Sequence, residues 1–188
     1  MAASPATGPG PLAPALRVAD LAYRLNGRIA LLASWVACLF MAGMVGLILT
    51  EIVLRSFFAT STHIVEEFVG YGLMTMIFLA LAHALHTGAV IRVDILLSTL
   101  GPTPRRLLEI LICLVTLAVV VFVGDNFWTH MVRRFESGTI SNSIAATPLW
   151  IPLAFVCFGF ALFGLQVLFY LLRLCLGGEL IRDDQELD

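Results

Sequence analysis

The residues best suited to polar chemistry are two pairs of charged side chains, Glu51 with Arg55 and Glu66 with Glu67, which border long apolar stretches. Glu51 and Arg55 are four residues apart, so on a helix they form an ion pair in the favourable order. An exposed pair of this kind contributes only about 0.3 to 0.5 kcal/mol, whereas a charge in the middle of a membrane costs about 2.5 to 3.5 kcal/mol. Two roles therefore stay open: an interfacial anchor whose side chains reach lipid headgroups, or a polar contact that holds the first helix against another helix or subunit.

Glu66 and Glu67 begin the second apolar stretch, where the positive end of a helix dipole stabilises acidic side chains. Adjacent residues point about 100° apart on a helix, so only one of the two acids can face the same partner as Arg55. Either could close an ion pair with Arg55 across the intervening loop, while the other remains in water.

Histidine and cysteine are candidate ligands and nucleophiles, but their positions do not favour either role. A haem bridge needs two facing histidines at similar depth, whereas His83 and His86 end one apolar stretch and His63 and His130 lie toward the opposite side. The cysteines stand alone in separate apolar segments: Cys38, Cys113, Cys157 and Cys175. Isolated thiols of this kind are expected to be packing residues, because a thiol oxidoreductase needs a close pair. We predict no catalytic residue, no cofactor and no metal site, and hence no enzyme.

The composition indicates that membrane spans position these side chains. Of the 188 residues 60% are apolar and 13% are charged, and the mean hydropathy is +0.96. The net charge of −2 and the absence of a polybasic run argue against a nucleic-acid partner and leave membrane lipids as the surroundings. The polar stretches that remain are too short to bury a core of their own.

Four stretches are long enough to cross a bilayer: residues 29–50, 68–85, 107–124 and 150–172. The first, at 1.5 Å per residue, spans about 33 Å. We therefore predict an all-α integral membrane protein whose four-helix domain covers residues 29–172. The Pro, Ala and Gly-rich residues 1–28 are expected to form a disordered tail, and residues 173–188 a second tail.

Arginine distribution predicts the orientation. Eight of the 11 basic residues, all arginines, lie in the two tails and the connection between the second and third stretches. The positive-inside rule then places both termini in the cytoplasm. In the same connection, Val93, Leu96, Leu97 and Leu100 form an apolar stripe that predicts a short amphipathic helix in the membrane interface.

The third helix is expected to continue beyond its span, because Phe127, Met131 and Phe135 keep a spacing of four residues until Gly138. Inside the spans, polar groups are sparse: Glu109 lies near a helix start, and Gln166 is the main deep polar residue. Substrate sites of transporters usually lie where a spanning helix is interrupted, and none of the four spans is interrupted in its middle. The chain is therefore not expected to hold a substrate or a coupling ion itself.

Four segments, in their order and spacing, resemble the small membrane subunit of tripartite ATP-independent periplasmic (TRAP) transporters over residues 30–172: TEIVLRSFF, VEEFVGYG, GAVIRVDILLSTLGP and SNSIAATPLWIPLAFVCFGFAL. The resemblance implies a four-helix subunit of the bacterial inner membrane. It also implies two partners: a large multi-span permease with the sodium and substrate sites, and a periplasmic binding protein that delivers the substrate, commonly an organic acid. The small subunit would belong to the fixed scaffold against which the transport domain moves.

The same resemblance assigns structural or interface roles to seven positions: Glu51, Arg55, Glu66, Glu67, Asp94, Pro148 and Trp150. An alternative is a membrane anchor subunit of a redox complex. A self-sufficient small exporter is a third possibility, but it usually carries an acid in the middle of its first helix, and residues 29–50 have none.

Overall fold

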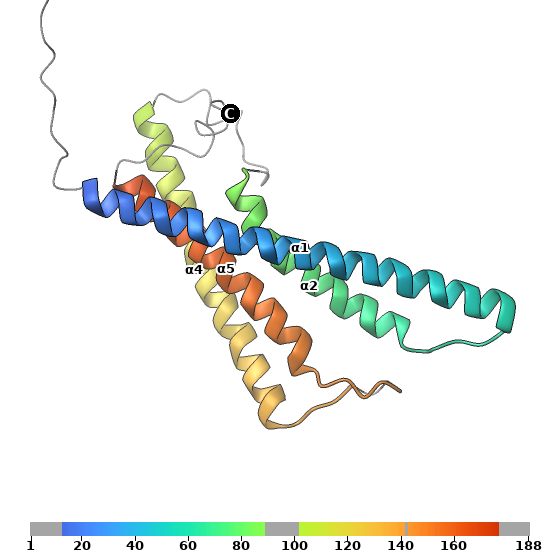
Figure 1. Ribbon diagram of the computed structural model, residues 1–188. Coiled ribbons are helices and arrows are strands. Elements are labelled where there is room, and N and C mark those ends of the chain that lie inside the picture. The colour runs from blue at the N-terminus through green and yellow to red at the C-terminus, as the bar shows by residue number, and fades with distance from the viewer. Residues whose placement is uncertain (1–12, 89–101, 142, 177–188) are drawn as a thin grey trace, which may run out of the picture.

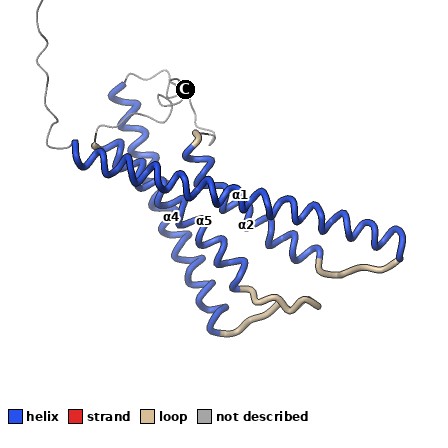
Figure 2. Tube along the Cα trace, in the orientation of Figure 1, coloured by secondary structure: helices blue, strands red, loops and turns tan. Residues whose placement is uncertain are grey.

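A computed structural model describes residues 13–88, 102–141 and 143–176. The described part contains four helices: α1 (Ala13–Phe58), α2 (Val65–His86), α4 (Pro102–Glu136) and α5 (Trp150–Cys175). All four are long and apolar enough to cross a membrane, which confirms the predicted all-α chain with four spanning helices. Figure 2 shows helices and loops only in this part. The predicted interfacial helix and Asp94 lie outside the described residues.

The first helix is longer than the sequence predicted. It begins at Ala13, so residues 13–28, which we assigned to a disordered tail, are helical. The physical reason is a stripe of buried residues that recurs every three or four positions along this helix: Ala19, Tyr23, Asn26, Ala30, Ala33 and Ala37. This spacing lets one narrow face of α1 pack against its neighbours.

The third helix ends as the sequence predicted. It runs without interruption to Glu136, and Gly138 follows in the left-handed region with φ +58°. There the Gly138 N–H donates to Phe135 O at 3.2 Å, and the Thr139 N–H donates to Arg134 O at 3.2 Å. Glycine adopts this conformation without the steric penalty of a Cβ atom, so it closes the helix.

The helices form two antiparallel hairpins, α1 with α2 and α4 with α5. Figure 1 shows α1 running obliquely across the other helices, and the two hairpins diverging toward their turns. Helix α2 packs against α1 and α5, α1 also contacts α5, and α4 packs on α5. The pair α2 and α5 therefore lies at the centre of the bundle.

Close backbone approach and aromatic contacts join the helices in their middle. A Cβ on Gly159 of α5 would lie 2.5 Å from Phe78 O of α2, so the two backbones touch. Beside this point the rings of Phe78, Phe127 and Phe160 meet edge to face, with centroids 5.6 to 5.7 Å apart. These three rings come from α2, α4 and α5, so the contact holds three helices together.

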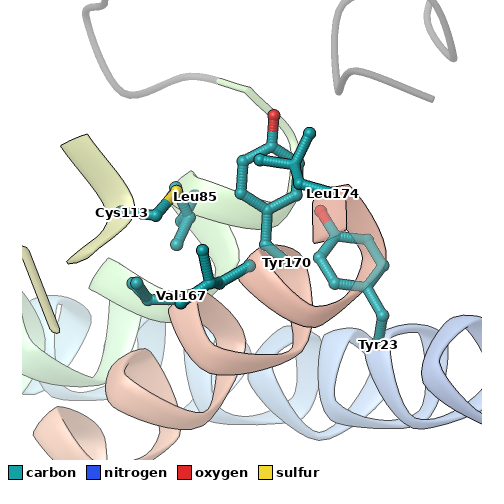
Figure 3. Close-up of a cluster of buried hydrophobic side chains, with 7 residues drawn as sticks. Tyr23, Leu85, Cys113, Val167, Tyr170 and Leu174 are labelled. Carbon is teal, nitrogen blue, oxygen red and sulfur yellow. The ribbon is translucent and has the colours of Figure 1, made fainter. Parts of the chain in front are cut away.

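Nearer the end where the helices converge, an apolar cluster fills the core (Figure 3); its members are Tyr23, Leu85, Cys113, Val167, Tyr170, Leu171 and Leu174. Cys113 thus packs in the core as expected. Cys38 and Cys175 are exposed, and all four cysteines are free thiols.

Candidate functional site: polar clusters at the two ends of the helix bundle

The carboxylate of Glu51 is buried in a cage of hydrogen-bond donors. Arg55 Nε lies 2.7 Å from Glu51 Oε1, and the Ser61 hydroxyl donates to the same oxygen. Thr62 donates to Oε2 twice, from its backbone N–H at 3.1 Å and from its hydroxyl at 2.6 Å. Four donors therefore converge on one carboxylate, and Glu51 is only 6% exposed.

This cage fixes the turn between α1 and α2. The chain reverses between Phe58 and Val65, and Ala59 and His63 take left-handed conformations there, with φ of 48° and 55°. Bonds from Ser61 and Thr62 to Glu51 stabilise that strained segment. Glu51 is thus an internal contact of its own hairpin, whereas the Arg55 side chain is 61% exposed and keeps part of its guanidinium open to lipid headgroups or a partner.

The acids that open α2 do not join this cage. Among the described residues Arg55 binds Glu51 and Ser61, so the ion pair that we expected with Glu66 or Glu67 is not formed. The Ser61 hydroxyl of the turn accepts from Arg55 Nη2 at 3.2 Å instead. Glu66 is exposed.

Glu67 instead faces the other hairpin. It accepts a hydrogen bond from the Tyr71 hydroxyl at 2.7 Å, and the side chains of Ser141, Ser143 and Thr147 lie near its carboxylate. These three residues belong to the connection between α4 and α5. Glu67 therefore places the start of α2 beside that connection.

The two remaining described candidates, Pro148 and Trp150, close the α4–α5 hairpin. Pro148 forms an isolated antiparallel bridge with Ile140, and the Leu149 N–H donates to Thr139 O at 3.2 Å. The Trp150 ring then packs edge-on against Phe135 at 5.4 Å between centroids. These contacts fix where α5 begins relative to the end of α4.

A second polar group, at the other end of the bundle, was not predicted from the sequence. Asn26 of α1 donates to Leu162 O at 3.2 Å and to the Gln166 side-chain oxygen. The other end of that amide, Gln166 Nε2, lies 2.9 Å from His86 Nδ1 of α2. Asn26 is 4% exposed and Gln166 is fully buried, so a hydrogen-bonded chain runs through the core from α1 over α5 to α2.

Further polar contacts extend this chain to α4. The Tyr170 hydroxyl donates to buried Glu109, and Arg106 donates to the Leu174 carbonyl. Arg173 pairs with Asp20 at 2.9 Å and lies over the Tyr23 ring, 5.6 Å from its centroid. We call this set the polar clamp; it consists of Asp20, Tyr23, Asn26, His86, Arg106, Glu109, Gln166, Tyr170 and Arg173.

The polar clamp also explains a glycine in α1. A Cβ on Gly27 would lie 2.5 to 2.7 Å from three ring atoms of His86, so only glycine admits the imidazole at this position. The sequence did hold a signal, because Gln166 is an isolated amide in an apolar helix and such residues usually have partners inside the bundle. Its partners are 80 and 140 residues away in the sequence, which local patterns do not connect.

Both clusters join helices to one another. Within residues 13–88, 102–141 and 143–176, no three His, Cys, Asp or Glu side chains are grouped so that they could hold a metal ion. The buried side chains of Asn26, Glu109 and Gln166 bind other groups of the bundle. The arrangement is therefore suited to holding the bundle in one shape.

The fold defines a multi-pass membrane protein, and comparison with known families gives its class. A family model described as the DctQ component of tripartite ATP-independent periplasmic transporters matches residues 44–177. No curated protein and no solved structure matches the chain.

Since the family match covers more than half of the chain, the protein belongs to the DctQ family, the small component of TRAP transporters. This confirms the resemblance that the sequence segments indicated. The family is a transporter component family and not an enzyme family, and the match gives no support to the alternative of a redox anchor subunit.

Proposed function

We propose that this chain is the small scaffold subunit of a TRAP-type secondary transporter in the bacterial inner membrane, with both termini in the cytoplasm. It supports a large multi-span permease that takes up an organic acid, driven by a sodium gradient. A periplasmic binding protein delivers the acid. The observation that carries this proposal is the family match over residues 44–177.

The hydrogen bonds of the buried polar side chains favour a scaffold role over a transporting one. Asn26, Gln166 and Glu109 are buried polar side chains, and each has a partner inside the bundle. Secondary transporters bind substrate and ions at interrupted helices near the bilayer midplane. Helices α2 and α5 instead continue without a break over 22 and 26 residues, so the described bundle offers no such opening.

The packing supports a fixed rather than a moving element. The polar clamp ties all four helices at one end, and the Gly159 contact brings the backbones of α2 and α5 together in the middle. A transport domain that moves through the membrane needs a wall that does not deform with it. A bundle locked by backbone contact and buried hydrogen bonds meets that need.

Reconstitution into liposomes tests the proposal. The assay measures accumulation of radiolabelled mono- and dicarboxylic acids under an inward sodium gradient, with the large subunit and the binding protein present or absent. We expect uptake only from the complete system, none from this chain alone, and loss of uptake when this chain is omitted. Accumulation by the lone chain, or full uptake without it, would refute the scaffold role.

A further inference from the structure

Asp125 is an exposed acidic side chain on an otherwise apolar face of α4. Around it on the same helix, Val121, Phe122 and Trp128 are 65%, 72% and 58% exposed. None of the hydrogen bonds and ion pairs among the described residues involves its carboxylate. The neighbouring Asn126 amide donates to Phe122 O of its own helix at 2.9 Å.

The contacts around Asp125 place it well inside the length of the spanning helices. It lines a cavity of about 370 Å³ together with Cys157 and Ala161 of α5. Those two residues are the eighth and twelfth of α5, which puts Asp125 about 10 to 17 Å along that helix from its start. The sequence-based span ended at Gly124, one residue earlier, and so treated Asp125 as lying outside the membrane.

A second contact gives the same depth independently. The Phe127 ring, two residues further along α4, meets Phe78 of α2 at 5.6 Å between centroids. Phe78 is the fourteenth of the 22 residues of α2, and that helix, at about 33 Å, is little longer than the hydrocarbon core of a bilayer. Asp125 is therefore level with the interior of both α2 and α5.

An acidic side chain at this depth needs a partner, because lipid tails offer no hydrogen-bond donor, and intramembrane acids almost always face protein or a water-filled cavity. We propose that the face of α4 formed by Val121, Phe122, Asp125 and Trp128 docks on a transmembrane helix of the large permease subunit that carries a basic side chain at this level. The inference rests on the proposed function, which supplies a multi-span partner.

Charge and shape favour this occupant over the alternatives. A second copy of the same face would bring two carboxylates together, which is unfavourable. A lipid tail would leave the carboxylate unsatisfied. The adjoining cavity is bordered by the small residues Gly124 and Ala161, so it has room for the end of a long basic side chain reaching from the partner.

Co-purification of the full-length chain with an affinity-tagged large subunit of its own transporter tests the docking face. Asp125→Asn should weaken recovery and Asp125→Lys should lower it at least about tenfold, since reversing one member of a buried charge pair is strongly unfavourable. The matched control is Glu136→Lys, a charge reversal at the exposed end of the same helix, which should leave recovery unchanged. Each variant is also passed alone through size-exclusion chromatography in detergent to verify that it folds.

A photo-cross-linking amino acid at Phe122 gives a readout that keeps Asp125 intact. It should cross-link to the large subunit, whereas the same probe at Ile144, an exposed residue of the α4–α5 connection, should not. Recovery of folded Asp125→Lys at the wild-type level, or cross-links from Phe122 only to lipid or to a second copy, would overturn the docking face. If the wild-type chain itself fails to co-purify, the proposed function is wrong, and the two failures are thereby distinguished.

Discussion

Replacing Gly159 by alanine should separate α2 from α5. The added Cβ would lie 2.5 Å from Phe78 O, 2.6 Å from Phe78 C and 2.8 Å from Leu79 N, where ordinary contact begins at 3.4 Å. All three are backbone atoms, so no side-chain rotation relieves the overlap, and the helices must move apart by about 1 Å to restore normal contact. Overpacking of this kind lowers the free energy of unfolding by about 1 to 3 kcal/mol.

The matched control is Gly43→Ala in α1, because nothing lies within 4 Å of a Cβ at Gly43. Both substitutions gain the same helix propensity, about 1 kcal/mol, so the difference between them isolates the overlap at Gly159. The measurement is equilibrium unfolding of the purified chain in mixed micelles titrated with dodecyl sulfate, followed by helical circular dichroism. Equal stability of the two variants would mean that α2 and α5 do not touch at Gly159, and the argument for a locked bundle would fail there.

Two further substitutions test the polar contacts. Gln166→Leu removes the bonds to Asn26 and His86 and should lower the free energy of unfolding by about 1 to 2 kcal/mol in the same titration. Side-chain hydrogen bonds between membrane helices contribute about 0.6 kcal/mol each on average. If the effects of Gln166→Leu and Asn26→Ala on this free energy were strictly additive in the double variant, direct contact between the two side chains would be contradicted. Arg55→Glu places a second carboxylate one turn from Glu51 and should reduce assembly with the large subunit or uptake, whereas wild-type levels of both would leave Arg55 only an interfacial anchor.

The number and type of the helices could be predicted because the signals are local. Length and hydropathy of each stretch identify a spanning helix whatever surrounds it. The same holds for the end of α4, where Gly138 has the backbone freedom that a helix stop requires. These features need no knowledge of which segments meet in space.

The predicted start of the first helix was wrong, because the true start of α1 depends on contacts with residues far away in the sequence. A Pro, Ala and Gly-rich beginning suggested disorder through residue 28. The helix over residues 13–28 is instead supported by Tyr23 and Asn26, which contact α2 and α5 far along the chain. Amino-acid composition is a local property, so it does not predict which other helices these residues contact.

The partners of Glu51 show a second limit of sequence reasoning. Charge led us to expect Glu66 or Glu67 as an ion-pair partner of Arg55, whereas the residues that join Glu51 and Arg55 are the uncharged Ser61 and Thr62. Serine and threonine are common in turns and carry no charge, so nothing marks them as the more important residues. An acidic residue in a spanning helix marks a position that needs hydrogen-bond donors. Which donors lie beside it depends on the conformation of the turn.

The distribution of contacts bears on how a scaffold could hold the proposed docking face on α4 in place. Helix α4 packs chiefly on α5, and Figure 1 shows the hairpin of these two helices diverging from α1 and α2 toward its turn. The bonds from Tyr170 to Glu109 and from Arg106 to the Leu174 carbonyl secure α4 at the clamped end, and the Phe127 ring secures it near Asp125. Both attachments hold α4 to α5, and α5 is in backbone contact with α2 at Gly159. The central helices therefore hold the face around Asp125 in position when the partner binds there.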